Sequence, residues 1–195
     1  QESTNLEAGS KWEIAGGRLL LTGAIFHTKN RNVIYTIDAT AVPPLYNQDD
    51  GQRVNGIALG MNGRILERWD VNANISYLDT ALETQNAANN GNRLTLTPRL
   101  SGGIWTTYRL PIRLTLGGGL RLADAVFVNA ANTIRTPGYT LLDLLAEFAM
   151  TQHTTLRLNV YNATNERYIR SVNNNGGRYN PGTPRAATVA LGVRF

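Results

Sequence analysis

Residues 112–122 read IRLTLGGGLRL, and this stretch decides the fold class. Isoleucine or leucine stands at positions 112, 114, 116, 120 and 122, and the positions between them hold only arginine, threonine or glycine. Successive side chains of a β-strand point to opposite faces, so this period of two predicts a strand with one apolar and one polar face. The same alternation recurs in residues 71–77, 156–161 and 187–195. The sequence therefore predicts an all-β protein.

The composition limits the class of protein. A chain of 195 residues with 42% hydrophobic content fits one domain, and we expect residues 1–195 to form a single region. The chain has no cysteine, which excludes disulfides and thiolate metal ligands, and it has no apolar run long enough for a membrane-spanning helix. A membrane-spanning barrel is still allowed. Because the chain starts at Gln1 without a leader, we expect a processed chain or a piece of a longer one.

The net charge of +5 comes from dispersed residues, almost all of them arginines. A nucleic-acid-binding protein concentrates its basic residues in a stripe or patch, often with a zinc-ligand spacing or a recognition helix. We therefore expect no nucleic acid among the partners. Dispersed arginines suit a polar lumen or a loop surface.

The connections between the expected strands alternate in length. The nine expected strands cover residues 4–14, 18–35, 52–64, 69–82, 98–109, 112–126, 138–150, 153–170 and 183–195. The short links lie at residues 15–17, 66–68, 111 and 151–153, and the long polar ones at 36–51, 83–97, 127–137 and 171–182. Tight turns at one end of a meander and long loops at the other are typical of an outer-membrane barrel.

A soluble sandwich or a lipocalin-like barrel also alternates its two faces. Here, however, arginine, asparagine, threonine and glycine would line the inside, the inverse of a soluble barrel. Aromatic side chains also gather toward strand ends, where a membrane interface favours them. These aromatic residues are Trp12, Trp69, Trp105, Tyr77, Tyr108 and Tyr139. The sequence thus favours an antiparallel transmembrane β-barrel of about nine or ten strands.

The end of the chain, LNVYNATNERYIRSVNNNGGRYNPGTPRAATVALGVRF from Leu158, resembles the carboxyl-terminal region of TonB-dependent outer-membrane receptors, particularly the ferric-siderophore group. Earlier stretches resemble the barrel strands of that group in order: TNLEAGSKWEI, GGRLLLTGAIF, GQRVNGIALGMNGRI, NRLTLTPRLSGGIWTTYRL and PGYTLLDLLAEF. The resemblance thus covers essentially the whole chain. The terminal Phe195, preceded by alternating apolar residues, resembles the signal that the outer-membrane assembly machinery reads.

The resemblance implies a location in the bacterial outer membrane and a part in ferric siderophore uptake. The architecture that the resemblance implies for the whole receptor is a 22-stranded barrel closed by a plug domain. This chain resembles only the last nine or so strands of such a barrel, without the plug. The chain alone would then not transport. The implied partners are outer-membrane lipid, the remaining strands, the plug, the ferric siderophore and the assembly machinery. No cofactor is implied.

Closure of the barrel leaves two alternatives. An antiparallel meander with an odd number of strands brings two parallel edges together and does not close in the usual way. Unpaired edges are costly in lipid, so the chain is either a segment completed by another polypeptide or a self-contained or engineered small barrel. A tenth strand at residues 32–41, after a turn near residues 29–32, would favour the small barrel.

Two groups of side chains are the candidate binding residues. Ferric siderophores carry negative charge and planar or amide-rich groups, which arginine and aromatic side chains recognise. The loop candidates are Tyr46, Arg135, Tyr168, Arg170, Arg178 and Tyr179. The arginines expected to form a hydrogen-bonded network with lumen carboxylates are Arg113, Arg121, Arg157 and Arg194. The carboxylates on that face are Glu7, Glu13, Asp143 and Glu147.

Catalytic candidates are sparse, and we expect no enzyme. His27 and His153 are the two histidines, and an outer-membrane lipid hydrolase would pair one of them with a serine. The chain has no G-x-S-x-G elbow, so hydrolysis is the weakest alternative. Asp49 and Asp50 precede Gly51 as in a turn and lack the further oxygen ligands of a calcium loop, so no metal site is expected.

Overall fold

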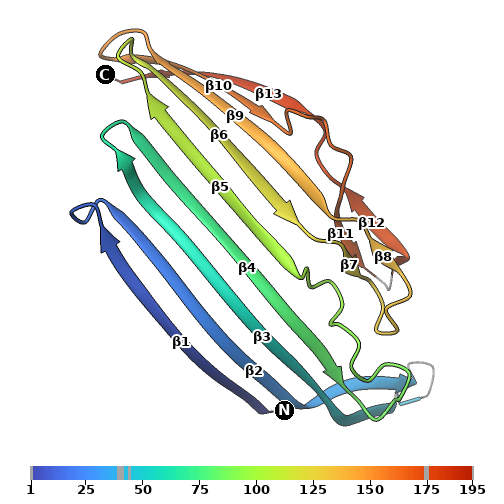
Figure 1. Ribbon diagram of the computed structural model, residues 1–195. Helices are drawn as coiled ribbons and strands as arrows, with labels where there is room; N and C mark the ends of the chain where they lie inside the picture. The colour runs from blue at the N-terminus through green and yellow to red at the C-terminus, as the bar shows by residue number, and fades with distance from the viewer. Residues whose placement is uncertain (1, 39–41, 44, 174–175, 195) are drawn as a thin grey trace.

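The computed structural model describes residues 2–38, 42–43, 45–173 and 176–194; within these ranges, the side chains of residues 33–38 and 45–50 are not described. The chain is almost wholly strand and loop (Figure 1). Within the described residues, no helix is long and apolar enough to span a membrane. The all-β prediction is confirmed.

Nine strands form one antiparallel sheet, in the order β1-β2-β3-β4-β5-β6-β9-β10-β13 (Figure 1). Their bounds are β1 Glu2–Ile14, β2 Leu19–Asp38, β3 Leu45–Leu66, β4 Trp69–Glu83, β5 Leu100–Arg109, β6 Leu114–Ala123, β9 Tyr139–Ala149, β10 Thr154–Tyr161 and β13 Ala186–Val193. Each inner strand of this sheet pairs with the sheet strands before and after it along the meander.

Short turns join the strands at one end of the sheet, which we call the turn side, and long loops join them at the other, the loop side. Two of the long loops carry small hairpins of their own. One is β7 (Val126–Phe127) with β8 (Arg135–Thr136), and the other is β11 (Ile169–Asn173) with β12 (Arg178–Pro181). The expected long connections are therefore present at residues 83–97, 127–137 and 171–182. The long loop expected at residues 36–51 is wrong, because β2 continues to Asp38 and β3 starts at Leu45.

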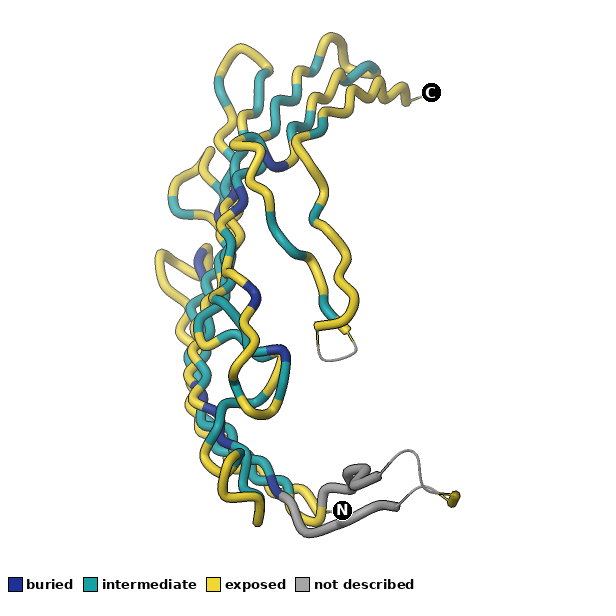
Figure 2. The backbone as a smooth tube through the Cα atoms, turned by 90° about the vertical axis from the view of Figure 1, so that its right-hand side faces the viewer, coloured by how far each residue is buried: buried dark blue, intermediate teal, exposed yellow. Residues whose placement is uncertain are grey.

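The sheet is open. Among the described residues, β1 pairs with β2 alone and β13 pairs with β10 alone, so these two strands are the opposite edges of the sheet. Figure 2 shows the sheet edge-on as a curved wall. This is the geometry of a barrel segment and not of a barrel that closes within the chain.

The two faces of the wall differ as the alternation predicts. The β11–β12 hairpin lies inside the curve (Figure 2), where Tyr168 at its base packs on Tyr139 of β9. The concave face is therefore the face of Tyr139 and, by the period of two, of Asp143 and Glu147. The apolar rows lie on the opposite, convex face and are exposed, for example Ile25 at 60% and Leu191 at 63%.

In the described part of residues 32–41, there is no separate tenth strand. Residues 32–38 continue β2, and the break near residues 29–32 is a bulge: the pairing of β2 with β3 shifts between Asn30 and Val33, with Asn32 at a φ of 55°. A bulge, like a turn, interrupts the alternation of side chains in the sequence, but after a bulge the strand continues in the same direction. In consequence β3 starts at Leu45, seven residues earlier than expected.

Two other boundaries also differ from the expectation. The strand expected at residues 153–170 ends at Tyr161, because Asn162 and Asn165, with φ of 48° and 57°, turn the chain before β11. The strand expected from residue 112 starts at Leu114, and Arg113 belongs to the preceding turn with a φ of 60°.

Four of the six aromatic residues expected at a membrane interface lie on the convex face: Trp12, Trp69, Tyr77 and Tyr108. The other two are corrections. Trp105 stands opposite Asn72 and Gly119, and Tyr139 stands opposite Ala123, all on the concave face. Each lies an odd number of residues from the apolar residues of its strand, so its side chain points to the other face. The prediction used only the nearness of these residues to strand ends and did not consider their face.

Candidate ligand-binding site in the long loops

Three long loops on the loop side pack together and form what we call the loop cluster: residues 84–99, 124–138 and 162–185. The loop cluster contains seven arginines and two carboxylates, a net charge of +5 that equals the net charge of the whole chain. The seven arginines are Arg93, Arg99, Arg135, Arg167, Arg170, Arg178 and Arg185. The positive charge of the chain is thus not evenly dispersed, because basic and acidic residues are equal in number outside the loop cluster.

The first two loops of the cluster are joined by hydrogen bonds. The Arg93 N–H donates to Asn132 Oδ1 at 2.8 Å, and Asn132 Nδ2 donates to the Arg93 carbonyl at 3.0 Å. Asn92 Nδ2 donates to the Ala130 carbonyl at 2.9 Å. The Leu96 N–H donates to the Phe127 carbonyl at 2.8 Å. These bonds hold the backbone around Arg93 against the second loop.

The third loop is anchored by Asn162, which is 3% exposed. Its Nδ2 donates to the carbonyls of Glu166 at 2.9 Å and Thr183 at 3.0 Å, and its Oδ1 accepts from the Glu166 N–H at 2.8 Å. Its own N–H donates to Asp143 Oδ1 at 2.8 Å. One side chain therefore joins the start and end of the loop, and its backbone ties the loop to the concave face.

Aromatic packing sets the direction of the β11–β12 hairpin. The rings of Tyr139 and Tyr168 have centroids 4.7 Å apart, and a side chain at Gly182 would collide with the Tyr168 ring. At the far end of the hairpin, Gly176 lies against Val128 and Ile134 of the second loop. The hairpin thus leans over the concave face and reaches the second loop.

A cavity of about 290 Å³ lies where the three loops meet the sheet. Its polar lining includes Asp124, Tyr139 and Arg170, and its apolar lining includes Leu96 and Ile169. A concave, mostly apolar space with a few convergent polar groups is the usual form of a small-molecule site.

Two guanidinium groups flank one aromatic ring in the loop cluster. The Cζ atoms of Arg93 and Arg135 stand 5.7 Å and 5.9 Å from the centroid of the Phe127 ring. Each contact is a cation–π interaction, which orients a guanidinium without neutralising its charge. Two oriented positive charges from different loops are suited to an anionic ligand.

The structure brings part of the sequence-predicted set together. Arg135 lies on β8 beside Phe127, Tyr168 packs on Tyr139, and Arg170 lines the cavity. Arg178 and Tyr179 lie on the exposed strand β12, with Tyr179 64% exposed. Tyr46 lies on β3 opposite Thr36, and its side chain is outside the described part. Phe195 also lies outside the described residues.

Sequence reasoning missed Arg93, Phe127, Asp124 and the two anchoring asparagines. Arg93 and Phe127 stand in polar loops with no motif, and only the packing of one loop on another brings them together. A weak signal for Asn132 and Asn162 exists, because asparagine is a residue that tolerates positive φ, and both adopt it.

The arginines expected on the concave wall have different surroundings. Arg121 Nη2 donates to Asp143 Oδ2 at 2.8 Å, and Arg157 Nε donates to Glu147 Oε2 at 2.7 Å, across neighbouring strands. Arg113 lies in a turn instead. Arg194 follows β13, and its N–H donates to the His153 carbonyl at 2.9 Å.

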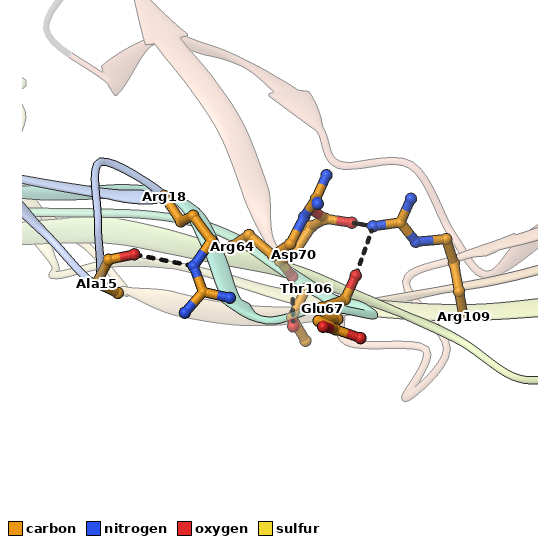
Figure 3. A network of polar contacts seen from close by, with 7 residues as sticks. All are labelled: Ala15, Arg18, Arg64, Glu67, Asp70, Thr106 and Arg109. Carbon is orange, nitrogen blue, oxygen red and sulfur yellow. Dashed lines mark hydrogen bonds and ion pairs between the residues drawn. The ribbon is translucent and has the colours of Figure 1, made fainter.

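A further polar network lies near the turn side (Figure 3). Asp70 joins two arginines from neighbouring strands: Arg109 Nη2 lies 2.8 Å from Oδ2 and Arg64 Nε 3.4 Å from Oδ1. Arg109 Nη2 also donates to the Glu67 carbonyl at 3.4 Å. With the side chain of Asp70 41% exposed, the network neutralises charge on the wall and adds little stability.

Neither histidine has the surroundings of a catalytic base. His27 Nδ1 lies 2.7 Å from Asn55 Oδ1 on the convex face, and His153 lies in a short turn. Ser76 Oγ and Ser101 Oγ hydrogen-bond each other at 3.1 Å on the concave wall. In the described ranges, no group of three or more histidines and carboxylates is arranged to hold a metal ion.

The sequence matches a family model described as "TonB dependent receptor-like, beta-barrel" over residues 1–163. The chain belongs to this family. Membership places it in the outer membrane, with its convex face toward lipid and its concave face toward the lumen of a barrel. By the topology of such barrels, the turn side is periplasmic and the loop cluster is external.

Relatives among known proteins cover most or all of the chain. It is 32% identical over 180 residues to a "Probable TonB-dependent siderophore receptor PiuA" of Acinetobacter baumannii, covering 87% of this chain and 24% of that protein. It is 27% identical to the "Catecholate siderophore receptor Fiu" of Escherichia coli K12, covering 100% and 26%. The chain thus spans about a quarter of the length of these relatives.

Solved structures of siderophore receptors superpose on the sheet of this chain. The crystal structure of PiuA from A. baumannii superposes with a TM-score of 0.90 at 30% identity, covering 98% of this chain and 28% of that one. The closed form of Fiu from E. coli K12 superposes with a TM-score of 0.84 at 27% identity, covering 99% and 27%. The open sheet is therefore a segment of a larger receptor barrel.

Proposed function

We propose that residues 1–195 form one barrel region, the carboxyl-terminal part of an outer-membrane receptor that takes up ferric siderophores. The siderophore receptor names of the relatives support this substrate class. The role of this region is to build part of the lumen wall and, through the loop cluster, part of the external rim that captures the ligand.

The charge of the loop cluster is the observation that carries the proposal. A ferric siderophore is an anion with planar chelating groups. The loop cluster offers it the guanidiniums of Arg93 and Arg135 beside Phe127, and a cavity lined by Tyr139 and Arg170. Guanidinium pairs with anionic oxygen bidentately, and aromatic rings stack on planar groups. Among the predicted residues, Arg170 lines this cavity and Tyr168 packs on its lining residue Tyr139, whereas Arg178 and Tyr179 on the exposed strand β12 would meet the ligand on its way in.

Transport requires parts that other polypeptide segments supply. The open edges at β1 and β13 call for the remaining strands, and the carboxylates and arginines of the concave wall face the place of a plug domain. We propose that Arg121 and Arg157 serve the wall through their ion pairs with Asp143 and Glu147 and do not contact the siderophore. The outer-membrane assembly machinery and lipid are the further partners.

Catalysis has no support from the geometry. A lipid hydrolase at the membrane interface needs a histidine beside a serine, yet the hydrogen bond of His27 goes to Asn55, and Ser76 bonds Ser101 on the opposite face. The names of the relatives are those of receptors. We therefore propose a binding role alone for this region.

The proposal is tested on the intact receptor that contains this region, purified in detergent. Its affinity for ferric catecholate and ferric hydroxamate siderophores is measured by intrinsic fluorescence quenching. The double variant Arg93→Gln/Arg135→Gln should bind the preferred chelate at least about tenfold more weakly, since two charge-assisted contacts are lost. Arg18→Gln, in a turn on the periplasmic side, is the matched control and should bind normally. Unchanged affinity in the double variant would refute this site.

A further inference from the structure

The convex face carries a shallow apolar groove of about 460 Å³ that the receptor function does not use. Its walls come from β1 through β6, and we call it the lipid-side groove. Its convex-face lining residues are Trp12, Leu21, Leu59, Met61, Ala73, Ile75, Gly102, Ile104, Leu120 and Leu122. Thr22, Gly60, Asn74 and Gly103, which stand at concave-face positions of their strands, complete its lining.

The groove follows two rows of residues in direct register. The first row runs Trp12, Leu21, Met61, Ala73, Ile104 and Leu120, each opposite the next on the neighbouring strand. The second row runs Gly23, Leu59, Ile75, Gly102 and Leu122. Apolar side chains thus line a continuous path across the strands.

Small residues hollow the groove. Gly23 leaves a space of methyl size between Trp12 and Leu59, because a Cβ placed there would make ordinary contacts of 3.6 Å with Trp12 Cζ3 and 3.4 Å with Leu59 Cδ2. Gly102 admits no side chain, since a Cβ there would lie 2.6 Å from the Asn74 carbonyl oxygen. Ala73 is the small member of the first row, between Met61 and Ile104.

The path has the length and slope of a lipid chain. From β1 to β6 it crosses five strand spacings of about 4.8 Å, or roughly 24 Å. Trp12 lies two residues from the turn-side end of β1, whereas Leu120 lies six residues from the turn-side end of β6. The groove therefore starts near the periplasmic interface and climbs obliquely. One leaflet contributes about half of the ~30 Å hydrocarbon core, so an inclined chain from that leaflet covers most of the groove.

We propose that the lipid-side groove holds one acyl chain of a phospholipid from the periplasmic leaflet. The groove is continuous with the apolar face that the family membership turns toward lipid, so hydrocarbon is the medium that reaches it. An empty groove would leave its lining without dispersion contacts, and water has almost no polar partner there. A flexible acyl chain fills such a narrow path, and Trp12 stands at its interfacial end, where tryptophan favours the membrane boundary.

The test uses the intact receptor in nanodiscs of phosphatidylethanolamine and phosphatidylglycerol, with a small fraction of phosphatidylethanolamine that carries a diazirine in one acyl chain. After photolysis, labelled peptides are mapped by mass spectrometry. Peptides that contain Leu21, Ala73 and Ile104 should carry more label than those with the equally lipid-facing Leu158 and Val189. Uniform labelling of the convex face would overturn the proposal.

Filling the groove gives the decisive comparison. Ala73→Leu should reduce labelling of the groove peptides to the level of the remaining convex face, and Gly23→Ala should reduce it in part. Ala146→Leu, on the convex face of β9 outside the groove, is the matched control and should leave the groove labelling unchanged. If Ala73→Leu folds, as judged by heat modifiability, and labels normally, the groove does not hold the chain. If the groove peptides instead cross-link to a second receptor copy, its occupant is protein and the proposal fails.

Discussion

Arg93 and Asn132 lie 39 residues apart in the sequence, in two different loops, and two reciprocal hydrogen bonds join them. The amide of Asn132 uses its oxygen and its nitrogen on the backbone of Arg93, as a paired strand residue would. The guanidinium of Arg93 lies over the ring of Phe127, with its Cζ 5.7 Å from the ring centroid. Under the proposed function, Asn132 is a positioning residue for Arg93.

The first prediction concerns this pair. Asn132→Gly removes the amide but tolerates the φ of 55°, so backbone strain does not confuse the result. We expect the intact receptor to bind its ferric siderophore about tenfold more weakly, because the ligand must now order the loop that carries Arg93. Calorimetry should show the loss mainly as entropy. Asn89→Gly, at a residue whose backbone bonds Asn86, is the control, and an equal loss there would argue against a positioning role.

The sheet could be predicted almost entirely because its information is local. In β6 and β10 the side chains alternate between lipid and lumen, so every second residue reports its environment. Errors arose where the backbone departs from this period: the bulge at Asn30 and Val33, and the left-handed residues Arg113 and Asn162. A bulge and a turn look alike in sequence, since both interrupt the alternation.

The site could be predicted only in part because its information is not local. The arginines and tyrosines of the third loop predicted it as a binding segment, and there Arg170 lines the cavity and Tyr168 packs on its lining residue Tyr139. Nothing in the sequence joins Arg93 to Arg135, which meet through hydrogen bonds between two loops. Closure could not be decided from the alternation either, because it depends on the pairing of the edge strands.

The second prediction concerns the aromatic ring between the two arginines. Phe127→Leu keeps an apolar side chain but removes both cation–π contacts. Each is worth about 0.5–1 kcal/mol at an exposed site, so affinity for the ferric siderophore should fall by roughly fivefold. Its dependence on salt should stay as in the wild type, since both charges remain. A flatter salt dependence would show instead that the arginines no longer reach the ligand.

The third prediction concerns the anchor of the third loop. Asn162→Gly removes three hydrogen bonds from a buried side chain and tolerates its positive φ. Two backbone carbonyls and one N–H then lose their partner, and opening of residues 163–185 should become easier by about 2–4 kcal/mol. Hydrogen exchange should rise in those residues and not in β4 or β5. Asn165→Gly is the comparison, because its side chain makes one bond, to the Arg185 N–H; exchange equal in the two variants would contradict the anchor.

The last prediction concerns the two open edges. β1 presents a row of unpaired backbone groups along 13 residues and β13 along 8, and each group left unpaired in hydrocarbon costs several kcal/mol. Residues 1–195 expressed alone should therefore fail to insert as a heat-modifiable monomer. Expressed with a separate chain that carries the remaining strands of the receptor, they should assemble into a split barrel that resists protease.

Proline variants test the edge itself. Lys29→Pro is not suitable, because it lies on β2, which is paired on both sides. Glu7→Pro on β1 should weaken the split barrel, because in this register the backbone N–H of Glu7 points away from β2, and proline removes that edge donor from the partner strand. A protease-resistant, heat-modifiable monomer of residues 1–195 alone would contradict the segment interpretation.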